Sequence, residues 1–249
     1  MRCIYLSDLH LESQPFRGTL PGGDVLIVAG DLCHARCLDP ARRDRYSVEQ
    51  RDRVRRFVDL ATSRFPHVLM VAGNHEHYDG ILEETVPCLR AGLPGVTVLD
   101  DEAVEVDGVR FIGTTLWSDF EGGSQDGLDR VRRRMGEFFF VKRRTATAEG
   151  TVALARFQPE HALALHRRSL AALRLQLDRA PARPTVVVSH HAPSLQGLNP
   201  RHAGNGLDGA YASNLDDLLS TLRNVPIWVH GHPHIRRVYR IGETEVRAN

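Results

Sequence analysis

Five short apolar runs of this 249-residue chain each end in side chains that can bind a cation or transfer a proton. These side chains are carboxylates, a carboxamide and imidazoles. Oxygen and imidazole ligands suit divalent first-row metal ions, whereas the absence of thiolates disfavours a soft-metal or purely structural zinc site. The candidate ligands are Asp8, His10, Asp31, Asn74, His190, His232 and His234, and His75 lies beside Asn74.

The number and spacing of these residues predict more than one ion. Seven candidates exceed what one ion with an open position needs, so we expect two ions about 3.5–4 Å apart that share a carboxylate. In the segments DLH (8–10) and HPH (232–234), two candidates are two residues apart. In extended backbone this spacing puts both side chains on the same side, so each segment can offer two ligands.

The five apolar runs predict the strands that position these side chains. The runs at 3–7, 24–30, 67–73, 185–190 and 227–231 are typical of strands buried on both faces. Residues 49–65 have apolar positions at helical spacing, which indicates a βαβ unit with the second and third runs. Ligands bind beyond the carboxyl ends of strands in open α/β sheets, so the candidate ligands should meet in one cleft if the strands are parallel.

Other segments predict further elements. We expect hairpins at 103–117, turning at Asp107-Gly108, and at 236–248, turning at Gly242. A helix is expected at 159–180, with an apolar stripe along one side. Residues 119–158 are irregular and are expected to form a cap or a mobile excursion within a single domain, residues 1–249.

Composition narrows the class of protein. Hydrophobic content of 42% and charged content of 25% are typical of a soluble globular protein. The net charge of +1 gives no global sign of nucleic-acid or membrane binding, and no apolar run approaches the roughly 20 residues of a membrane span. The chain reads as a strand from residue 2, which leaves no room for a signal peptide, so we expect a cytoplasmic protein with reduced cysteines.

Taken in order, the segments DLH, GD, GNHE, HH and GHPH resemble the signature of the calcineurin-like metallophosphoesterase superfamily, from residue 8 to residue 234. Each tripeptide alone is weak evidence, but five in order after strand-like runs are specific. The resemblance implies an α/β fold with two packed mixed β-sheets flanked by helices, in four layers (αββα).

The resemblance also implies roles for the motif residues. One metal would be held by Asp8, His10 and His234 with Asp31, which bridges to a second metal completed by Asn74, His190 and His232. The implied reaction is phosphoester hydrolysis by a metal-bridging hydroxide, with His75 as general acid. The cofactors would be two divalent ions, with Mn²⁺ expected and Fe or Zn as alternatives, because this ligand set accepts several metals.

His34 differs from the residue that protein Ser/Thr phosphatases of the superfamily have at this position, and the difference bears on the substrate. Where protein Ser/Thr phosphatases of the superfamily have Asp, this chain has GDLCH, which resembles the G-D-x-x-H of the repair-nuclease branch. The resemblance implies that His34 orients His75 or contacts the phosphate. We therefore expect a small phosphodiester, nucleotide-type or organic, as substrate. The alternatives are a phosphomonoesterase or protein phosphatase, a nuclease, and a non-catalytic metal-binding scaffold. Oligomeric state is left open.

Several residues allow two interpretations. His190 is preferred to His191 as the ligand, and His166 and His230 are expected to be packed. His77 and Tyr78 either line the substrate site or are structural. The basic stretch 130–144 is either a phosphate-binding patch or a solvated face, and the segment 194–213 is either a specificity loop or a connection.

Overall fold

The computed structural model describes residues 1–147, 149–179, 182–201 and 204–249. Its first sheet has the strand order β1-β2-β3-β4, and all neighbouring pairs are parallel. Two helices, α1 and α2, connect its strands and lie against one face. The bounds are β1 Cys3–Leu6, β2 Val25–Ala29, α1 Arg45–Arg64, β3 His67–Val71, α2 Leu82–Gly92 and β4 Val96–Leu99.

The second sheet is mixed. Its order is β11-β12-β10-β9-β6-β5, with a parallel centre and an antiparallel hairpin at each edge. The bounds are β5 Glu102–Val106, β6 Val109–Thr114, α6 Pro159–Arg179, β9 Thr185–Ser189, α7 Asp208–Tyr211, α8 Asp216–Thr221, β10 Ile227–His230, β11 Arg237–Ile241 and β12 Thr244–Ala248. Both predicted hairpins and the predicted helix are confirmed, although residue 180 at the end of that helix lies outside the described residues.

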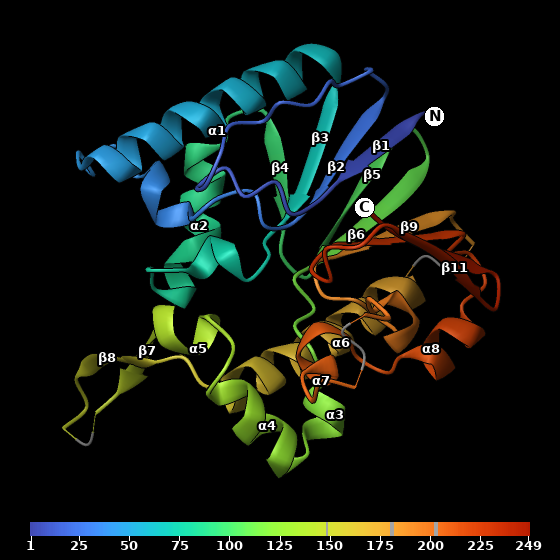
Figure 1. Cartoon of the computed structure of the whole chain (residues 1–249). Helices are drawn as coiled ribbons and strands as arrows, with labels where there is room; N and C mark the ends of the chain where they lie inside the picture. Colours follow the sequence, from blue (N-terminus) through green and yellow to red (C-terminus); the bar gives the residue numbers. More distant parts are fainter. Residues whose placement is uncertain (148, 180–181, 202–203) are drawn as a thin grey trace.

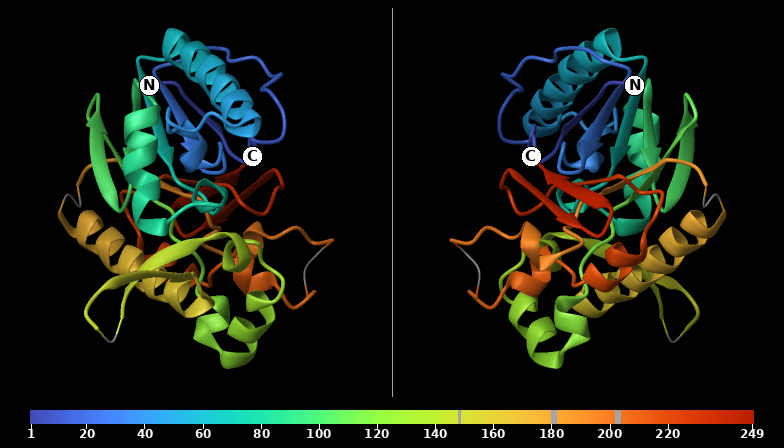
Figure 2. Two further views of the ribbon diagram at one scale, coloured as in Figure 1. Left: turned by 90° about the vertical axis from the view of Figure 1, so that its left-hand side faces the viewer. Right: turned by 90° about the vertical axis from the view of Figure 1, so that its right-hand side faces the viewer.

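Three hydrophobic clusters separate four layers. In the first, Val54 and Phe57 of α1 pack on one face of the first sheet, together with Leu26 of β2. The second lies between the sheets, and the third packs α6 and α8 on the outer face of the second sheet. Helix α1 and helix α6 therefore lie on opposite sides of the two sheets (Figures 1 and 2). The predicted αββα arrangement is confirmed.

Strand β1 differs from the prediction that all five runs are buried on both faces. Cys3 is exposed and Ile4, Tyr5 and Leu6 are half-buried, whereas every residue of β2 and β9 is buried. The reason is position: β1 is the edge strand of its sheet and lacks a neighbour on one side.

Residues 119–158 contain more regular structure than we predicted. They form the short helices α3 Phe120–Gly123, α4 Gln125–Arg132 and α5 Glu137–Phe140, and the antiparallel hairpin of β7 Lys142–Ala146 with β8 Val152–Arg156. Phe120, Leu128 and Phe138 share a buried cluster with Leu163 of α6, so the helical part is anchored, whereas the hairpin projects from the body (Figure 1). No described helix combines the length and apolar character needed to cross a membrane.

Candidate metal centre

The predicted ligands lie together where strands of both sheets end. Asp8 and His10 follow β1, Asp31 follows β2 and Asn74 follows β3, while His190 follows β9 and the pair His232 and His234 follows β10. Members distant in the chain come close together: His10 and His234 are 224 residues apart in sequence, and their Nε2 atoms are 3.3 Å apart.

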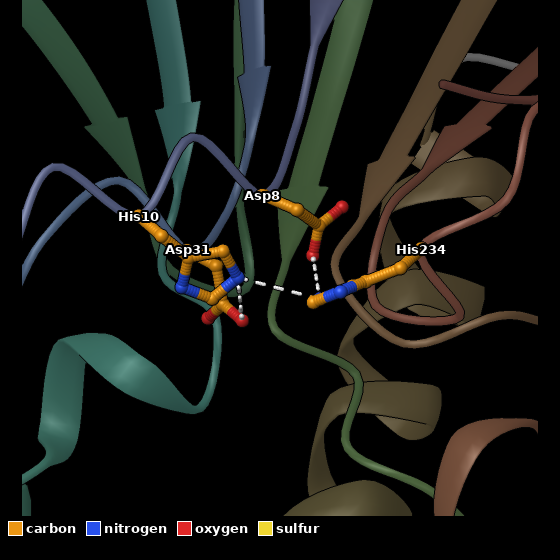
Figure 3. A group of neighbouring side chains, drawn as sticks. All are labelled: Asp8, His10, Asp31 and His234. Carbon is orange, nitrogen blue, oxygen red and sulfur yellow. Dashed lines mark hydrogen bonds and ion pairs between the residues drawn. The ribbon is translucent and has the colours of Figure 1, made fainter. Parts of the chain in front are cut away.

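These side chains form two groups that share one carboxylate. Within each group, every residue offers one nitrogen or oxygen atom, and these atoms all lie within 4.8 Å of one another. The carboxylates and imidazoles of the first group point toward one another (Figure 3). The first group is Asp8, His10, Asp31 and His234, and the second is Asp31, His190 and His232. Asn74 joins the second group through its Oδ1, which lies 3.1 Å from His190 Nε2.

The hydrogen bonds of the second group leave a gap that suits a cation. His190 Nδ1–H donates to the carbonyl of Ala29 at 2.8 Å, so its Nε2 presents a lone pair. That Nε2 faces two acceptors, Asn74 Oδ1 and, at 3.4 Å, Asp31 Oδ1. His232 Nε2 is buried and has no hydrogen-bond partner among the described residues. Lone pairs that face one another in a buried site are unfavourable without a cation, so the residues fit divalent metal.

Electrostatics support the same conclusion. Burial lowers the pKa of His190, but the charge and hydrogen bond of Asp31 raise it to about 10. Burial raises the pKa of Asp31, and His190 in turn holds it well below its usual range. Asp31 therefore stabilises a positive charge at His190, as expected of a place that holds a cation.

The backbone that presents the ligands is not extended, which corrects our reasoning on the DLH and HPH segments. Asp8, His10, Asp31, His232 and His234 all have left-handed φ angles, between 46° and 74°. Asp and His tolerate this region better than most residues, yet it is strained. The HPH segment consequently sends His234 to the first group and His232 to the second.

Glycines keep the backbone close to these ligands. A Cβ atom on Gly73 would lie 2.2 Å from Asp31 Oδ1, and a Cβ atom on Gly30, where φ is +87°, would lie 2.3 Å from His190 Nδ1. The constraint at Gly73 is therefore the close approach of Asp31.

Glu76, the last residue of the GNHE segment, ties two of the ligand loops together. Its buried carboxylate accepts from the backbone N–H groups of Asp31 at 2.9 Å, Leu32 at 2.6 Å, Cys33 at 3.0 Å and Gly73 at 2.6 Å. No role for Glu76 was predicted from the sequence. It holds the loop after β2 against the loop after β3, and thereby fixes the position of Asp31.

His75 lies at the edge of the two groups. Its backbone N–H donates to Asp31 Oδ1 at 2.9 Å, and its ring stacks on Tyr78 with 4.3 Å between centroids. Burial lowers the pKa of His75, but Glu12 and Asp31 raise it above its ordinary value. A histidine with a raised pKa that borders a metal site can donate a proton to a leaving group.

His34 is close to His75 but is not its hydrogen-bond partner among the described contacts. The two ring centroids are 6.1 Å apart, and His34 Nδ1 faces the Tyr46 hydroxyl at 3.3 Å. The Nδ1 of His75 is instead 3.2 Å from Glu12 Oε1. Contact between His34 and a phosphate stays a prediction.

Other histidines have structural surroundings. His191 is buried behind His232, with 4.1 Å between ring centroids. His166 and His230 are buried and hydrogen-bonded to backbone carbonyls, as expected. His77 is buried, bonds Thr85 Oγ1 at 2.8 Å and stacks on Trp117, so it belongs to the core rather than the cleft.

A cleft of 480 Å³ opens beside the two groups. Its lining includes residues from both segments to which the sequence gave two interpretations. Arg134, Met135 and Gly136 come from the basic stretch 130–144. The segment 194–213, whose residues 202–203 lie outside the described residues, contributes Leu198, Asn199, Asn205, Asp208 and Tyr211. Tyr78 also lines this cleft, and its role at a substrate site stays a prediction.

Comparisons with known proteins agree with this geometry. The strand ends of two packed β-sheets bring together two groups of carboxylates and imidazoles that share Asp31. This arrangement defines a candidate binuclear metal protein. The model of the family described as calcineurin-like phosphoesterase matches residues 1–236, and the chain belongs to that family.

Similar curated proteins are distant. The chain is 22% identical over 197 residues to an uncharacterized protein, L509, of Acanthamoeba polyphaga mimivirus, which covers 73% of this chain and 66% of that protein. It is 33% identical over 128 residues to the UPF0046 protein K07C11.7 of Caenorhabditis elegans, covering 46% of this chain and 39% of that protein. The chain thus matches less than two thirds of the length of these relatives.

Solved structures share the fold. Phosphopantetheinyl hydrolase from Mycobacterium tuberculosis has a TM-score of 0.62 and 22% identity, covering 99% of this chain and 87% of that chain. A putative 5'-nucleotidase from Staphylococcus aureus has a TM-score of 0.51 and 16% identity, covering 99% of this chain and 48% of that chain.

Proposed function

We propose that this chain is a two-metal phosphoesterase that hydrolyses phosphodiesters, either nucleotide-type or small organic. The observation that supports it most is that Asp31 belongs to two ligand groups at once, while its carboxylate also accepts the backbone N–H of His75. A shared carboxylate beside a potential proton donor is what a two-metal hydrolase requires.

The proposed ligands are those predicted from the sequence. Asp8, His10, Asp31 and His234 would hold one ion, and Asp31, Asn74, His190 and His232 the other, with Mn²⁺ proposed and Fe or Zn as alternatives. When bound, two such ions supply a nucleophilic water at neutral pH and offset the charge of the phosphoryl oxygens. His75 donates a proton to the leaving oxygen, which typically contributes about 10²–10⁴-fold.

The cleft supports a diester rather than a monoester. Its walls include the apolar side chains of Met135 and Leu198 and the ring of Tyr78, which suit an organic group on the second ester oxygen. Among the described cleft residues, Arg134 is the single Arg or Lys side chain, so little is provided for the extra charge of a monoester. We also propose that residues 119–158 act as a cap over the cleft, because Arg134 and Met135 come from this segment.

A small substrate is favoured over nucleic acid. Three of the seven Arg and Lys side chains of the basic stretch form ion pairs: Arg130 with Glu121, Arg132 with Asp129 and Glu160, and Arg144 with Glu84. Paired arginines contribute little to phosphate-backbone binding, which depends on free cationic side chains.

The test is hydrolysis of bis(p-nitrophenyl) phosphate and p-nitrophenyl phosphate by protein loaded with Mn²⁺. We expect the diester to be turned over faster, and Asp31→Asn to lose at least about 100-fold in kcat. His75→Ala should lose less here, because p-nitrophenolate leaves with little need of a proton. Asp52→Asn, a half-buried acid of α1, is the matched control and should be unchanged. Preference for the monoester would indicate a phosphomonoesterase, and bound metal without turnover would indicate a scaffold.

A further inference from the structure

One carboxylate outside the predicted site contacts two of its histidines. Glu12 Oε1 lies 2.8 Å from His10 Nδ1 and 3.2 Å from His75 Nδ1. The Glu12 side chain is only 8% exposed. His10 is a proposed metal ligand and His75 is the proposed proton donor, so Glu12 links two different functions of the site.

The contact determines which ring nitrogen of each histidine carries hydrogen. A carboxylate can only accept, so Nδ1–H of both His10 and His75 must donate to Glu12. His10 Nε2 is then free for a cation, and it faces the first ligand group at 3.9 Å from Asp31 Oδ2 and 3.3 Å from His234 Nε2. The Nε2 of His75 is left for the substrate side.

Glu12 is held in place by its backbone. The Arg53 guanidinium of α1 donates to the carbonyls of Leu11 at 3.2 Å and Glu12 at 3.0 Å. The N–H of Leu11 donates to the carbonyl of Leu32 at 2.9 Å. The loop after β1 is thus fixed to α1 and to the loop after β2, and the carboxylate is presented at a defined position.

The partners of Glu12 differ from those of a structural glutamate. Both carboxylate oxygens of Glu76 accept hydrogen bonds from backbone N–H groups, four in all. The second oxygen of Glu12, Oε2, is buried without a hydrogen-bond partner among the described residues. Its side-chain hydrogen bonds are to imidazoles of the site, so removing the carboxylate changes the site more than the fold.

We propose that Glu12 is a positioning residue that holds His10 and His75 in the same tautomer, and so couples metal binding to proton donation. The proposal rests on the proposed function for the role of His75. The tautomers of His10 and His75 can be tested without measuring turnover.

The first experiment reads the tautomers directly. Long-range ¹H–¹⁵N correlation spectra of the metal-free protein distinguish a protonated Nδ1 from a protonated Nε2. We expect Nδ1–H for His10 and His75 in the parent protein and a mixture in Glu12→Gln, with Glu102→Gln, an exposed acid paired with Arg90, as the unchanged control. Unaltered tautomers in Glu12→Gln would overturn the proposal even if no substrate is known.

Metal binding is the second readout and also needs no turnover. Calorimetric titration with Mn²⁺ should show a loss of about 10-fold in affinity for Glu12→Gln, because the partner of a ligating histidine typically contributes 10–100-fold. Glu12→Asp keeps the negative charge on a side chain that is shorter by one methylene. Its Mn²⁺ affinity should lie between those of the parent and Glu12→Gln. Thermal unfolding of both variants checks that they are folded. Affinity equal to that of the parent would contradict the coupling to His10.

The third readout separates positioning of the proton donor from a general structural effect. Methyl aryl phosphodiesters are compared with leaving groups from p-nitrophenol to phenol. Glu12→Gln should lower kcat by about 10–100-fold for phenol and by much less for p-nitrophenol, because only poor leaving groups need the proton. In the His75→Ala background the leaving-group dependence of this loss should vanish. An equal loss across the series would overturn the proposal, whereas no turnover by the parent would count against the proposed function alone.

Discussion

The carboxylate of Glu137 lies 3.5 Å from the side-chain nitrogen of Asn74, although the two residues are 63 positions apart. Tyr78 completes the contact, since its hydroxyl donates to Glu137 Oε2 at 3.1 Å and accepts from Asn74 Nδ2 at 3.2 Å. With its nitrogen held in this way, the Asn74 amide turns its oxygen toward His190. Helix α5, within residues 119–158, thereby orients a proposed ligand of the second metal.

Removal of this carboxylate should weaken the second metal site. In Glu137→Ala the Asn74 amide loses an acceptor and can rotate, so we expect the weaker-bound Mn²⁺ to lose about 10-fold or more in affinity. Calorimetric titration measures this, with Phe139→Ala on the exposed side of α5 as control. Two equivalents of Mn²⁺ bound with parent affinity would show that Asn74 needs no such support.

The Glu76 contact predicts a large effect on stability. In Glu76→Gln an amide NH₂ would face backbone N–H groups that now donate to a carboxylate, so buried donors lose their acceptor. We expect the free energy of unfolding to fall by about 2–5 kcal/mol. Urea unfolding of the metal-free protein measures it, and the exposed Glu102→Gln should change it by less than about 0.5 kcal/mol.

If Glu76→Gln changed the free energy of unfolding by less than about 0.5 kcal/mol, the loops after β2 and β3 would hold together without the carboxylate. If the loss is found, turnover by the folded fraction should fall for all leaving groups alike. This contrasts with the selective loss expected for Glu12→Gln.

Burial of His77 should make the folded protein less stable at acidic pH. Burial lowers its pKa to about 4, whereas the unfolded chain binds the proton near pH 6.5. Between these values the unfolded state carries more protons, so the free energy of unfolding rises with pH and is lost on acidification. At pH 5 the loss from this group is about 2 kcal/mol relative to pH 7.

The variant His77→Gln keeps a partner for Thr85 and removes this titration. Urea unfolding at pH 7 and pH 5 should therefore show a pH-dependent loss that is smaller by about 2 kcal/mol than in the parent. Equal losses in both proteins would indicate that the imidazole becomes protonated without cost in the folded state.

Gly73 predicts a steric effect on the shared carboxylate. The Cβ atom of Gly73→Ala would lie 2.2 Å from Asp31 Oδ1, so Asp31 must move and both ligand groups are disturbed. We expect a loss of about 100-fold or more in Mn²⁺ affinity. Gly108→Asn is the control, because Gly108 has left-handed φ and open space around it, and Asn tolerates both. Parent affinity in Gly73→Ala would mean that the loop has room to shift.

Much of the fold could be predicted because burial leaves a mark in composition. The runs that became β2 and β9 are apolar throughout because both of their faces are covered, and α6 has an apolar stripe because one face is. The exposure of β1 could not be predicted, since an apolar run does not show which strand lies at an edge. Residues 119–158 could not be predicted either, because their short helices are stabilised by packing on α6 more than by local sequence.

The candidate site shows the same division. The placement of Asp8, Asp31 and His190 follows from motif order, and the structure brings them together, while their binding of metal stays a proposal. Glu137 carries no sequence signal, because its partner Asn74 is distant in the chain and the contact depends on how residues 119–158 fold back. Glu12 offers only a weak signal, its position two residues after His10.

The left-handed φ angles of Asp8, His10, Asp31, His232 and His234 have an evolutionary consequence. Each holds a side chain where the backbone would accept glycine or asparagine with less strain, of order 1 kcal/mol per position. Chains that lost one of these side chains would therefore gain stability as they lost metal ligands. Selection for thermal resistance alone should drift toward such replacements, so a stabilised library of this protein has to be screened for turnover at every round.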